Sequence, residues 1–186
     1  MLYNTHMIAG LLATESYLVL TGYELKTENI PEICIAMALT LVFSTMPDAD
    51  QRQSWAGKRF FPLSLILSIL GVAHRGLTHS LLFTLVVWYL LTLTPLSDVL
   101  VLSAVIAYAS HWFIDMFNVT GIQILYPLQM KFKFGTNIDV DGFGEVLFRN
   151  ICLGLLALIT FIWVKPYITD IGIIENLKFF FRFFSI

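Results

Sequence analysis

The apolar stretch PLSLILSILGVA, residues 62–73, decides how this chain would be threaded through a membrane. At about 1.5 Å per residue, a helix of this length would reach roughly 18 Å, whereas the hydrocarbon core of a bilayer is about 30 Å thick. The stretch is therefore too short to cross. We predict a re-entrant or interfacial helix, which returns the chain to the face from which it came.

The composition of the whole chain is that of a protein dissolved in lipid. Of its 186 residues, 58% are hydrophobic and 13% are charged, and the mean hydropathy is +0.79. These values exclude a disordered chain, a coiled coil and a nucleic-acid binder, which needs a basic surface. The length suits a single integral membrane domain over residues 1–186. Cys34 and Cys152 lie in apolar runs, so we expect no disulfide and no redox role.

Five longer segments come close to the roughly 17–25 apolar residues that a crossing helix requires. They are residues 3–20, 31–46, 79–94, 97–117 and 146–164, the last ended by Lys165 and Pro166. The first lacks the basic start and the small-residue cleavage site of a signal peptide, so we expect a helix there. The predicted fold class is an all-α, polytopic membrane bundle of about five transmembrane helices and one short re-entrant or interfacial helix.

Two further patterns complete the expected architecture. Residues 131–134 and 138–141 alternate with a period of two around Gly-Thr-Asn, which predicts a small hairpin at the membrane surface. Residues 171–186 place charged and apolar side chains at helical spacing, which predicts an amphipathic helix lying in the interface.

Ionisable groups are costly at membrane depth, yet this chain concentrates them in four short places. These are Thr5-His6, the sequence PDAD at 47–50, HRGLTHS at 74–80 and HWFID at 111–115, and together they hold all four histidines. If residues 62–73 do not cross, the flanking helices return all four places to one face. Helix length and the grouping of polar residues therefore favour the same topology independently.

The distribution of basic residues predicts the orientation. On this topology the site face carries Arg52, Lys58, Arg59, Arg75, Lys131, Lys133 and Arg149, and the other face carries Lys26, Lys165, Lys178 and Arg182. Under the positive-inside rule this difference favours a cytoplasmic site face.

Two histidine motifs have spacings that suit a metal site. His111 and Asp115 are at i, i+4 and would share one helix face. Gly76 is expected to break the helix between His74 and His79, so that the two rings can converge from a turn. Taken alone, each motif has an ordinary structural alternative, namely a His–Asp hydrogen bond at a helix end and a surface turn.

The remaining candidates are carboxylates and one early histidine. Asp48 and Asp50 would share one side of an extended stretch, where they suit a hard or borderline cation, although a solvated helix cap is the alternative. His6 alone could be a histidine bonded to backbone or lipid. The argument rests on the set of seven candidate metal ligands on one face, which are His6, Asp48, Asp50, His74, His79, His111 and Asp115.

These donors predict a cofactor and a reaction class. With nitrogen and oxygen donors and no cysteine nearby, zinc is the first choice, and manganese, iron or magnesium are alternatives, as one or two ions. Bound divalent metal lowers the pKa of water, so hydrolysis is the natural reaction. Arg75, beside a helix start that Thr78 or Ser80 can cap, suits an anion or phosphate, or else lipid headgroups.

Polar residues further along the chain are less informative. We treat Asp139, Asp141 and Glu145 as surface residues, because the spacing of a calcium loop is absent. Glu145 and Arg149, at i, i+4, could border the site.

The order of the motifs resembles a known family. An early His, Pro-Asp-x-Asp, His-Arg-Gly-x-Thr-His-Ser and His-x-x-x-Asp between hydrophobic helices are similar to the predicted inner-membrane metal-dependent hydrolases, some of whose bacterial members are controlled by the repressor LexA. The resemblance covers about residues 3–130. It implies that the seven candidate ligands are metal or catalytic residues, with Arg75, Thr78 and Ser80 supporting them. It also implies a location in the inner membrane of a bacterium or archaeon. Asp50 would take the place of a third polar residue that often follows Pro-Asp in the family.

We therefore expect a membrane-bound metal-dependent hydrolase, in which metal-activated water attacks an ester. A site at the interface suggests a phosphoester of a lipid or lipid-linked substrate. Asp48, Asp115 and Arg75 would carry the catalytic roles, with the metal or Arg75 stabilising the leaving group. Two other classes stay open: a transporter or carrier of a metal ion or proton, whose polar groups would be spread through the membrane depth, and a structural protein whose polar residues cap helices.

Overall fold

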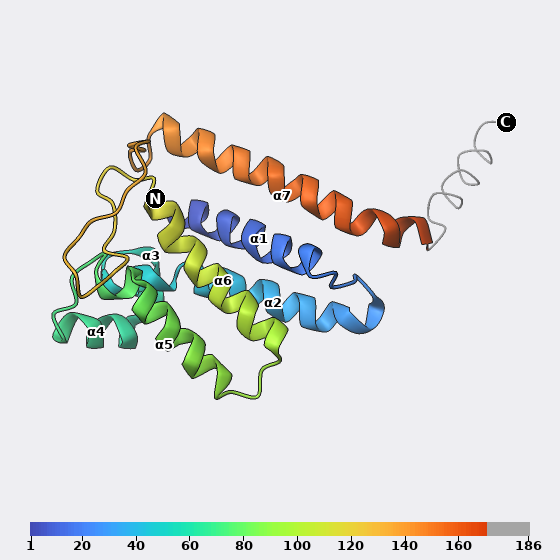
Figure 1. Ribbon diagram of the computed structural model, residues 1–186, viewed down its shortest axis with the longest axis horizontal. Coiled ribbons are helices and arrows are strands. Elements are labelled where there is room, and N and C mark those ends of the chain that lie inside the picture. Colours follow the sequence, from blue (N-terminus) through green and yellow to red (C-terminus); the bar gives the residue numbers. More distant parts are fainter. Residues whose placement is uncertain (171–186) are drawn as a thin grey trace.

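The computed structural model describes residues 1–170, and the interfacial helix predicted for residues 171–186 lies outside them. The described residues form seven α-helices and three short 3-10 helices, with no β-strand. In chain order these are α1 (Tyr3–Leu20), η1 (Thr27–Asn29), α2 (Ile30–Phe43), η2 (Met46–Asp50), α3 (Trp55–Arg59), α4 (Phe61–Ile69), η3 (Leu77–His79), α5 (Leu81–Thr92), α6 (Asp98–Asp115) and α7 (Phe143–Asp170). The predicted all-α fold is confirmed (Figure 1).

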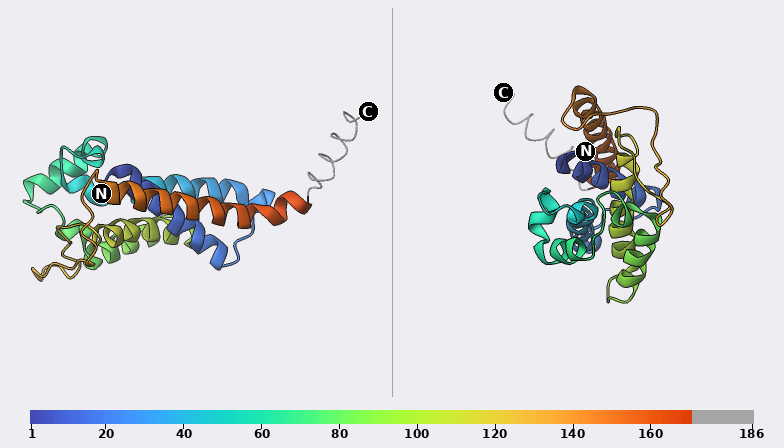
Figure 2. Two further views of the ribbon diagram at one scale, coloured as in Figure 1. Left: turned by 90° about the horizontal axis from the view of Figure 1, so that it is seen from above. Right: turned by 90° about the vertical axis from the view of Figure 1, so that its left-hand side faces the viewer.

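Helix α1 holds the bundle together. It packs against α2, α6 and α7, while α6 also contacts α2 and α5. Figures 1 and 2 show α7 on the outside of the bundle and the short helices α3 and α4 at one end. Half of the apolar window of α6 is buried, compared with 6% of that of α7. Most of the large side chains that α7 exposes, such as Leu155 and Phe161, are apolar, which suits a helix facing lipid.

Three helical segments are long and apolar enough to cross a membrane, namely Thr27–Asp50, Asp98–Asp115 and Phe143–Ile168. Helix α5 is shorter than the span predicted there, and its 12 residues would reach only about 18 Å. Helix α1 has 18 residues but carries polar side chains, including Thr14 and Glu15, on its buried face. Of the five predicted spans, three therefore meet the requirements of a crossing helix by themselves.

The short stretch that determined the predicted topology forms α4, which has nine residues and stays at one end of the bundle (Figure 1). Helices α3 and α4 both contact η2. Ser54 caps α3 by accepting a hydrogen bond from the N–H of Gly57 (2.8 Å), and Gly71, with φ of +66°, turns the chain after α4. The chain thus enters and leaves this region at the same end, as its length predicts.

Helix α7 is longer than predicted. We expected Lys165 and Pro166 to end it, but it continues to Asp170 with Pro166 inside. A proline removes one backbone N–H and crowds one carbonyl, and membrane helices tolerate this because local adjustments satisfy the freed group. The proline therefore does not mark the boundary of this helix.

The prediction of a surface hairpin is wrong. The two alternating segments do not pair with each other, and isolated bridges instead join Ile122 to Phe132 and Asn118 to Ile138. Ile122 and Phe132 exchange two backbone hydrogen bonds, of 3.0 and 2.8 Å. The backbone groups of this stretch are therefore satisfied by the segment that follows α6, and the stretch covers the end of the bundle.

Helices α1 and α2 approach closely at Gly10, which provides a test of the packing. A Cβ atom at this position would lie 2.6 Å from the Cβ of Ser44. We expect Gly10→Ala to force the helices apart and to lower the free energy of unfolding by about 1–3 kcal/mol. The measurement is denaturant unfolding of the detergent-purified protein. Gly154→Ala is the matched control, since a Cβ there meets nothing within 4 Å; equal effects of the two variants would contradict this packing.

Candidate metal centre

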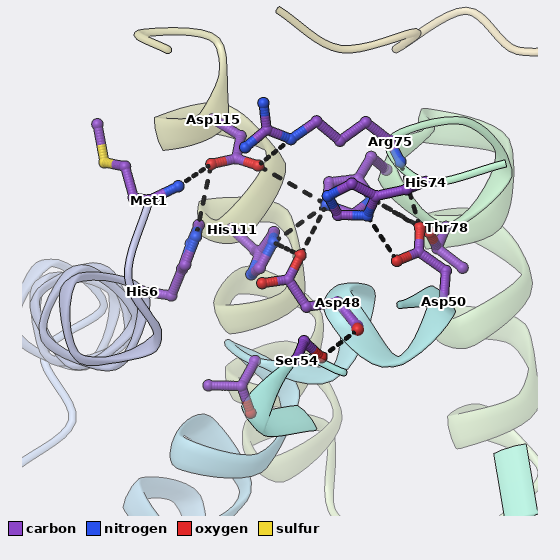
Figure 3. Close-up of polar contacts among 12 residues, drawn as sticks. Met1, His6, Asp48, Asp50, Ser54, His74, Arg75, Thr78, His111 and Asp115 are labelled. Atoms are coloured by element: carbon purple, nitrogen blue, oxygen red, sulfur yellow. Dashed lines mark hydrogen bonds and ion pairs between the residues drawn. The ribbon is translucent and has the colours of Figure 1, made fainter. Parts of the chain in front are cut away.

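The seven predicted ligands meet at one end of the bundle, where α1 begins and α6 ends (Figure 3). Helix α1 supplies His6, η2 supplies Asp48 and Asp50, the loop after α4 supplies His74, η3 supplies His79, and α6 supplies His111 and Asp115. The rings of His6 and His111 stack with centroids 3.6 Å apart, and those of His79 and His111 are 4.9 Å apart. The predicted gathering of all four histidines at one rim is therefore observed.

Most of this cluster is shielded from solvent. The side chains of His6, His79 and His111 are 0% exposed, and that of Asp115 is 1% exposed. His74, with 36% of its side chain exposed, forms the outer rim. Burial of this many ionisable groups is unfavourable unless they are paired or bind a cation.

We call five of these residues the inner cluster: His6, Asp48, His79, His111 and Asp115. The Nε2 atoms of His79 and His111 are 3.2 Å apart, and each lies 3.4 Å from Oδ1 of Asp48. The carboxylate of Asp115 lies 3.7 Å from Nε2 of His79 and 3.5 Å from Nε2 of His6. Donor atoms from α1, η2, η3 and α6 therefore point at a common centre.

Hydrogen bonds around the inner cluster determine which ring nitrogens carry protons. Nδ1 of His111 donates to the carbonyl of Ser44 (2.7 Å). The hydroxyl of Thr78 donates to Asp50 (2.7 Å), so its oxygen accepts from Nδ1 of His79 (3.0 Å). When these rings are neutral, the Nε2 atoms of His79 and His111 both present lone pairs to the carboxylate of Asp48.

Three lone pairs that face one another at these distances repel unless a proton or a cation lies between them. Metal-binding histidines commonly donate their other ring N–H to a carboxylate, a backbone carbonyl or water. His111 donates to the carbonyl of Ser44, and His79 donates to Thr78, whose hydroxyl in turn donates to the carboxylate of Asp50. Both ring nitrogens of His6 are buried without a hydrogen-bond partner. The donor set therefore fits a divalent cation with nitrogen and oxygen ligands.

Asp50 lies outside the inner cluster, because other groups occupy its carboxylate. One oxygen pairs with Nδ1 of His74 (2.8 Å), and the other accepts from the hydroxyl of Thr78 and the backbone N–H of Arg75 (3.2 Å). The predicted extended stretch is incorrect, since η2 is a 3-10 helix and sends Asp48 and Asp50 in different directions. Asp50 is placed to orient the turn that carries the histidines.

Arg75 connects the inner cluster to the segment that follows α6. Its φ of +63° is in the left-handed region, and its Nε lies 3.3 Å from Oδ2 of Asp115. A terminal nitrogen of its guanidinium contacts the hydroxyl of Thr120. The side chain therefore reaches from the buried carboxylate toward the surface.

The predicted anion site at the start of α5 is not open. Ser80 caps this helix, as predicted, by accepting from the N–H of Phe83 (3.2 Å), and the N–H of Leu81 donates to the carbonyl of Ile124 (2.9 Å). These N–H groups are therefore unavailable to an external anion.

Glu145 was wrongly predicted to be a surface residue. It is fully buried and accepts hydrogen bonds from the hydroxyl of Thr5 (2.8 Å), the backbone N–H of Asp141 (2.7 Å) and the backbone N–H of Leu2. It thus fixes the start of α1 behind His6. Its position at the first turn of an apolar helix was the only sequence signal. Arg149 makes no contact with the cluster in the part of the chain that the structure describes.

The fold and this site define a class: a helical membrane protein with a buried His–Asp cluster at one end of its bundle. The chain belongs to the YdjM inner membrane protein family, whose family profile matches residues 1–171. The sequence resemblance to a family of inner-membrane proteins is thereby confirmed, and an integral inner-membrane location follows from the family and from the apolar helices.

Two relatives illustrate the range of similarity. The "Uncharacterized protein YvsG" of Bacillus subtilis (strain 168) is 28% identical over 145 residues, which cover 77% of this chain and 84% of that protein. The "Inner membrane protein YdjM" of Escherichia coli (strain K12) is 32% identical over 124 residues, which cover 63% of this chain and 59% of that protein. No solved structure matches the chain.

The role of Asp50 can be tested through stability. Asp50→Ala would remove the carboxylate that pairs with the ring of His74, the backbone N–H of Arg75 and the hydroxyl of Thr78. We expect the free energy of unfolding to fall by about 3 kcal/mol, because buried polar groups that lose a charged partner are strongly destabilising. Asp139→Ala, at an exposed aspartate, is the control and should change little. Denaturant unfolding gives both values; a loss below about 1 kcal/mol at Asp50 would contradict this role.

Proposed function

We propose that this protein is a membrane-bound hydrolase that uses a divalent metal ion in the inner cluster to cleave an ester, with a phosphoester of a lipid or lipid-linked substrate as the expected class. The observation that carries the proposal is the convergence of two buried imidazole lone pairs and an oxygen of the half-buried Asp48 carboxylate within 3.2–3.4 Å. A soluble ester would not require the site to lie at the end of a membrane bundle, whereas a lipid substrate would.

The donor types favour zinc, and manganese, iron and magnesium are the alternatives. Three groups of three donors can be drawn from His6, Asp48, His74, His79, His111 and Asp115, each within 4.8 Å. Because these groups share members, they accommodate one ion or two. His74 belongs to the outermost group, and its exposed side chain places it on the route by which a substrate would enter.

The residues of the site would have separate roles in hydrolysis. A divalent ion in this cluster would polarise the ester and lower the pKa of water. Asp48 or Asp115 would accept the proton of the attacking water, the ester bond to the leaving oxygen would break, and the alcohol would leave with a proton. The guanidinium of Arg75 would donate to the charge that develops on the leaving group. Asp50 would hold His79 in position through Thr78.

A second candidate is a carrier of a metal ion or proton, and one observation favours it. Polar side chains continue from the site into the bundle, where the hydroxyl of Thr40 donates to that of Thr14 (2.8 Å). Glu15, 5% exposed, accepts from Thr160 (2.9 Å) at a similar depth. Hydrogen bonds of this kind also hold membrane helices together without transport. Metal-dependent flux into proteoliposomes without ester turnover would make transport the better description.

Metal content provides the primary test of the hydrolase proposal. Purified protein is expected to hold one or two equivalents of divalent metal, measured by elemental analysis. His111→Ala and Asp48→Ala should each remove most of that metal and, in a screen of lipid and nucleotide phosphoesters, reduce hydrolysis by about 10³-fold or more. Ser110→Ala, next to His111 but bonded only to the carbonyl of Ala107, is the matched control. Unchanged metal content in both site variants would rule out this assignment.

The orientation of the site is a separate proposal, since the basic residues favour a cytoplasmic site face. In a background with Cys34 and Cys152 replaced, Arg59→Cys reports on the site end and Lys26→Cys on the opposite end. We expect a membrane-impermeant maleimide to label position 59 only in inverted vesicles and position 26 only in right-side-out cells. The reverse pattern would place the site on the periplasmic face.

A further inference from the structure

A cavity of about 400 Å³ lies beside the inner cluster, and the proposed hydrolysis assigns it no role. Its wall includes His74, Arg75, Thr120, Gly121, Gln123 and Lys131. Two of these residues are cations, and none of the residues that line it in the described part of the chain is acidic. The cavity therefore offers a positive environment directly next to a cluster of carboxylates.

The backbone around the cavity is held in a defined shape. The carbonyl of Arg75 accepts from the N–H of Gln123 (3.2 Å), and Ile122 and Phe132 exchange two hydrogen bonds. Gly121 has a φ of +61°, and a Cβ atom there would lie 2.7 Å from the carbonyl oxygen of Phe132. The close approach holds the segment of Phe132 against that of Gly121, and both Lys131 and Arg75 line the cavity between them.

Arg75 joins the cavity to the inner cluster. Its Nε faces Asp115 and one terminal nitrogen contacts Thr120, and a guanidinium has five N–H donors in all. Donors therefore remain for an anion in the cavity. If the phosphate group of a substrate occupied the cavity, its ester bond would face the inner cluster. The two cations would then offset the repulsion between the phosphate and the carboxylates of Asp48 and Asp115.

Three exposed apolar side chains in the loop between two cavity residues, here called the apolar rim, indicate the source of the anion. Leu125, Leu128 and Met130, in the loop between the cavity residues Gln123 and Lys131, are 43%, 56% and 58% exposed. Exposed apolar side chains at the end of a membrane bundle suit contact with acyl chains. A phosphate carried by a lipid would have its charge in the cavity and its chains against this rim.

We infer that this cavity binds the phosphate group of the substrate and that Lys131 is a specificity-determining residue for it. The inference rests on the proposed hydrolase function, and it deepens that function by naming where the anionic group sits. It concerns binding alone, so it can be tested without turnover.

The test is calorimetric binding of dihexanoyl phosphatidic acid to the detergent-purified full chain. We expect Lys131→Glu to weaken binding about tenfold or more, because a cation that contacts the phosphate becomes an anion that repels it. Lys133→Glu is the matched control, since Lys133 lies two residues away, outside the cavity lining, and contacts Asn137 (3.4 Å). Equal binding by Lys131→Glu and the unchanged protein, or equal weakening by both variants, would overturn the inference.

A second probe distinguishes a lipid phosphate from a free one. If the apolar rim contributes, inorganic phosphate should bind at least tenfold more weakly than dihexanoyl phosphatidic acid, and equal binding would indicate a soluble phosphoester instead. In both cases the Lys131 dependence supports the cavity as the phosphate site.

Failure of this inference can be separated from failure of the proposed function. Binding that depends on Lys131 in protein that contains no metal would support the cavity and contradict the metal-dependent hydrolase. Hydrolysis of a neutral ester by metal-loaded protein that binds neither phosphate probe would support the hydrolase and overturn the cavity. Unchanged unfolding midpoints for both lysine variants ensure that the comparison concerns binding.

Discussion

Two buried imidazole lone pairs and the carboxylate oxygen of the half-buried Asp48 face one another, and the rest of the structure depends on satisfying them. His79 and His111 use their Nδ1 protons on Thr78 and on the carbonyl of Ser44, so their Nε2 atoms are directed toward Asp48. Such an arrangement is unfavourable unless a proton or a cation lies between these atoms, because buried lone pairs repel one another at low dielectric. The supporting hydrogen bonds are those that a metal site needs, and this is why the cluster can be preorganised within a helical bundle.

The fold brings these donors together through helix ends rather than helix faces alone. Helix α4 is too short to cross, so the loop after it stays at the end where α1 begins and α6 ends (Figure 1). The close approach of α1 to Ser44 at Gly10 links packing to chemistry, since the carbonyl of Ser44 orients His111. The segment after α6 then covers the rim and forms the cavity beside Arg75. The geometry of the site therefore depends both on the packing of α1 against Ser44 and on the short α4.

Periodicity, length and motif spacing were enough to predict the all-α membrane bundle, the short helix and the gathering of four histidines. They could not predict the parts that depend on tertiary hydrogen bonds. The burial of Glu145 had one weak local signal, its place in the first turn of an apolar helix, and its partners Thr5 and Leu2 lie some 140 residues away. The alternating residues 131–141 pair with the segment after α6 instead of with each other, and a period of two does not identify the partner. The orienting role of Asp50 likewise cannot be predicted from the sequence without the position of His74.

The central claim is that imidazole nitrogens and carboxylate oxygens from separate segments bind one metal centre. X-ray absorption at the zinc edge of the zinc-loaded, detergent-purified protein tests this most directly. We predict a first shell of only nitrogen and oxygen atoms at about 2.0–2.2 Å, with the outer-shell scattering of at least two imidazole rings. A spectrum without imidazole scattering, or a sulfur shell at about 2.3 Å, would contradict the account.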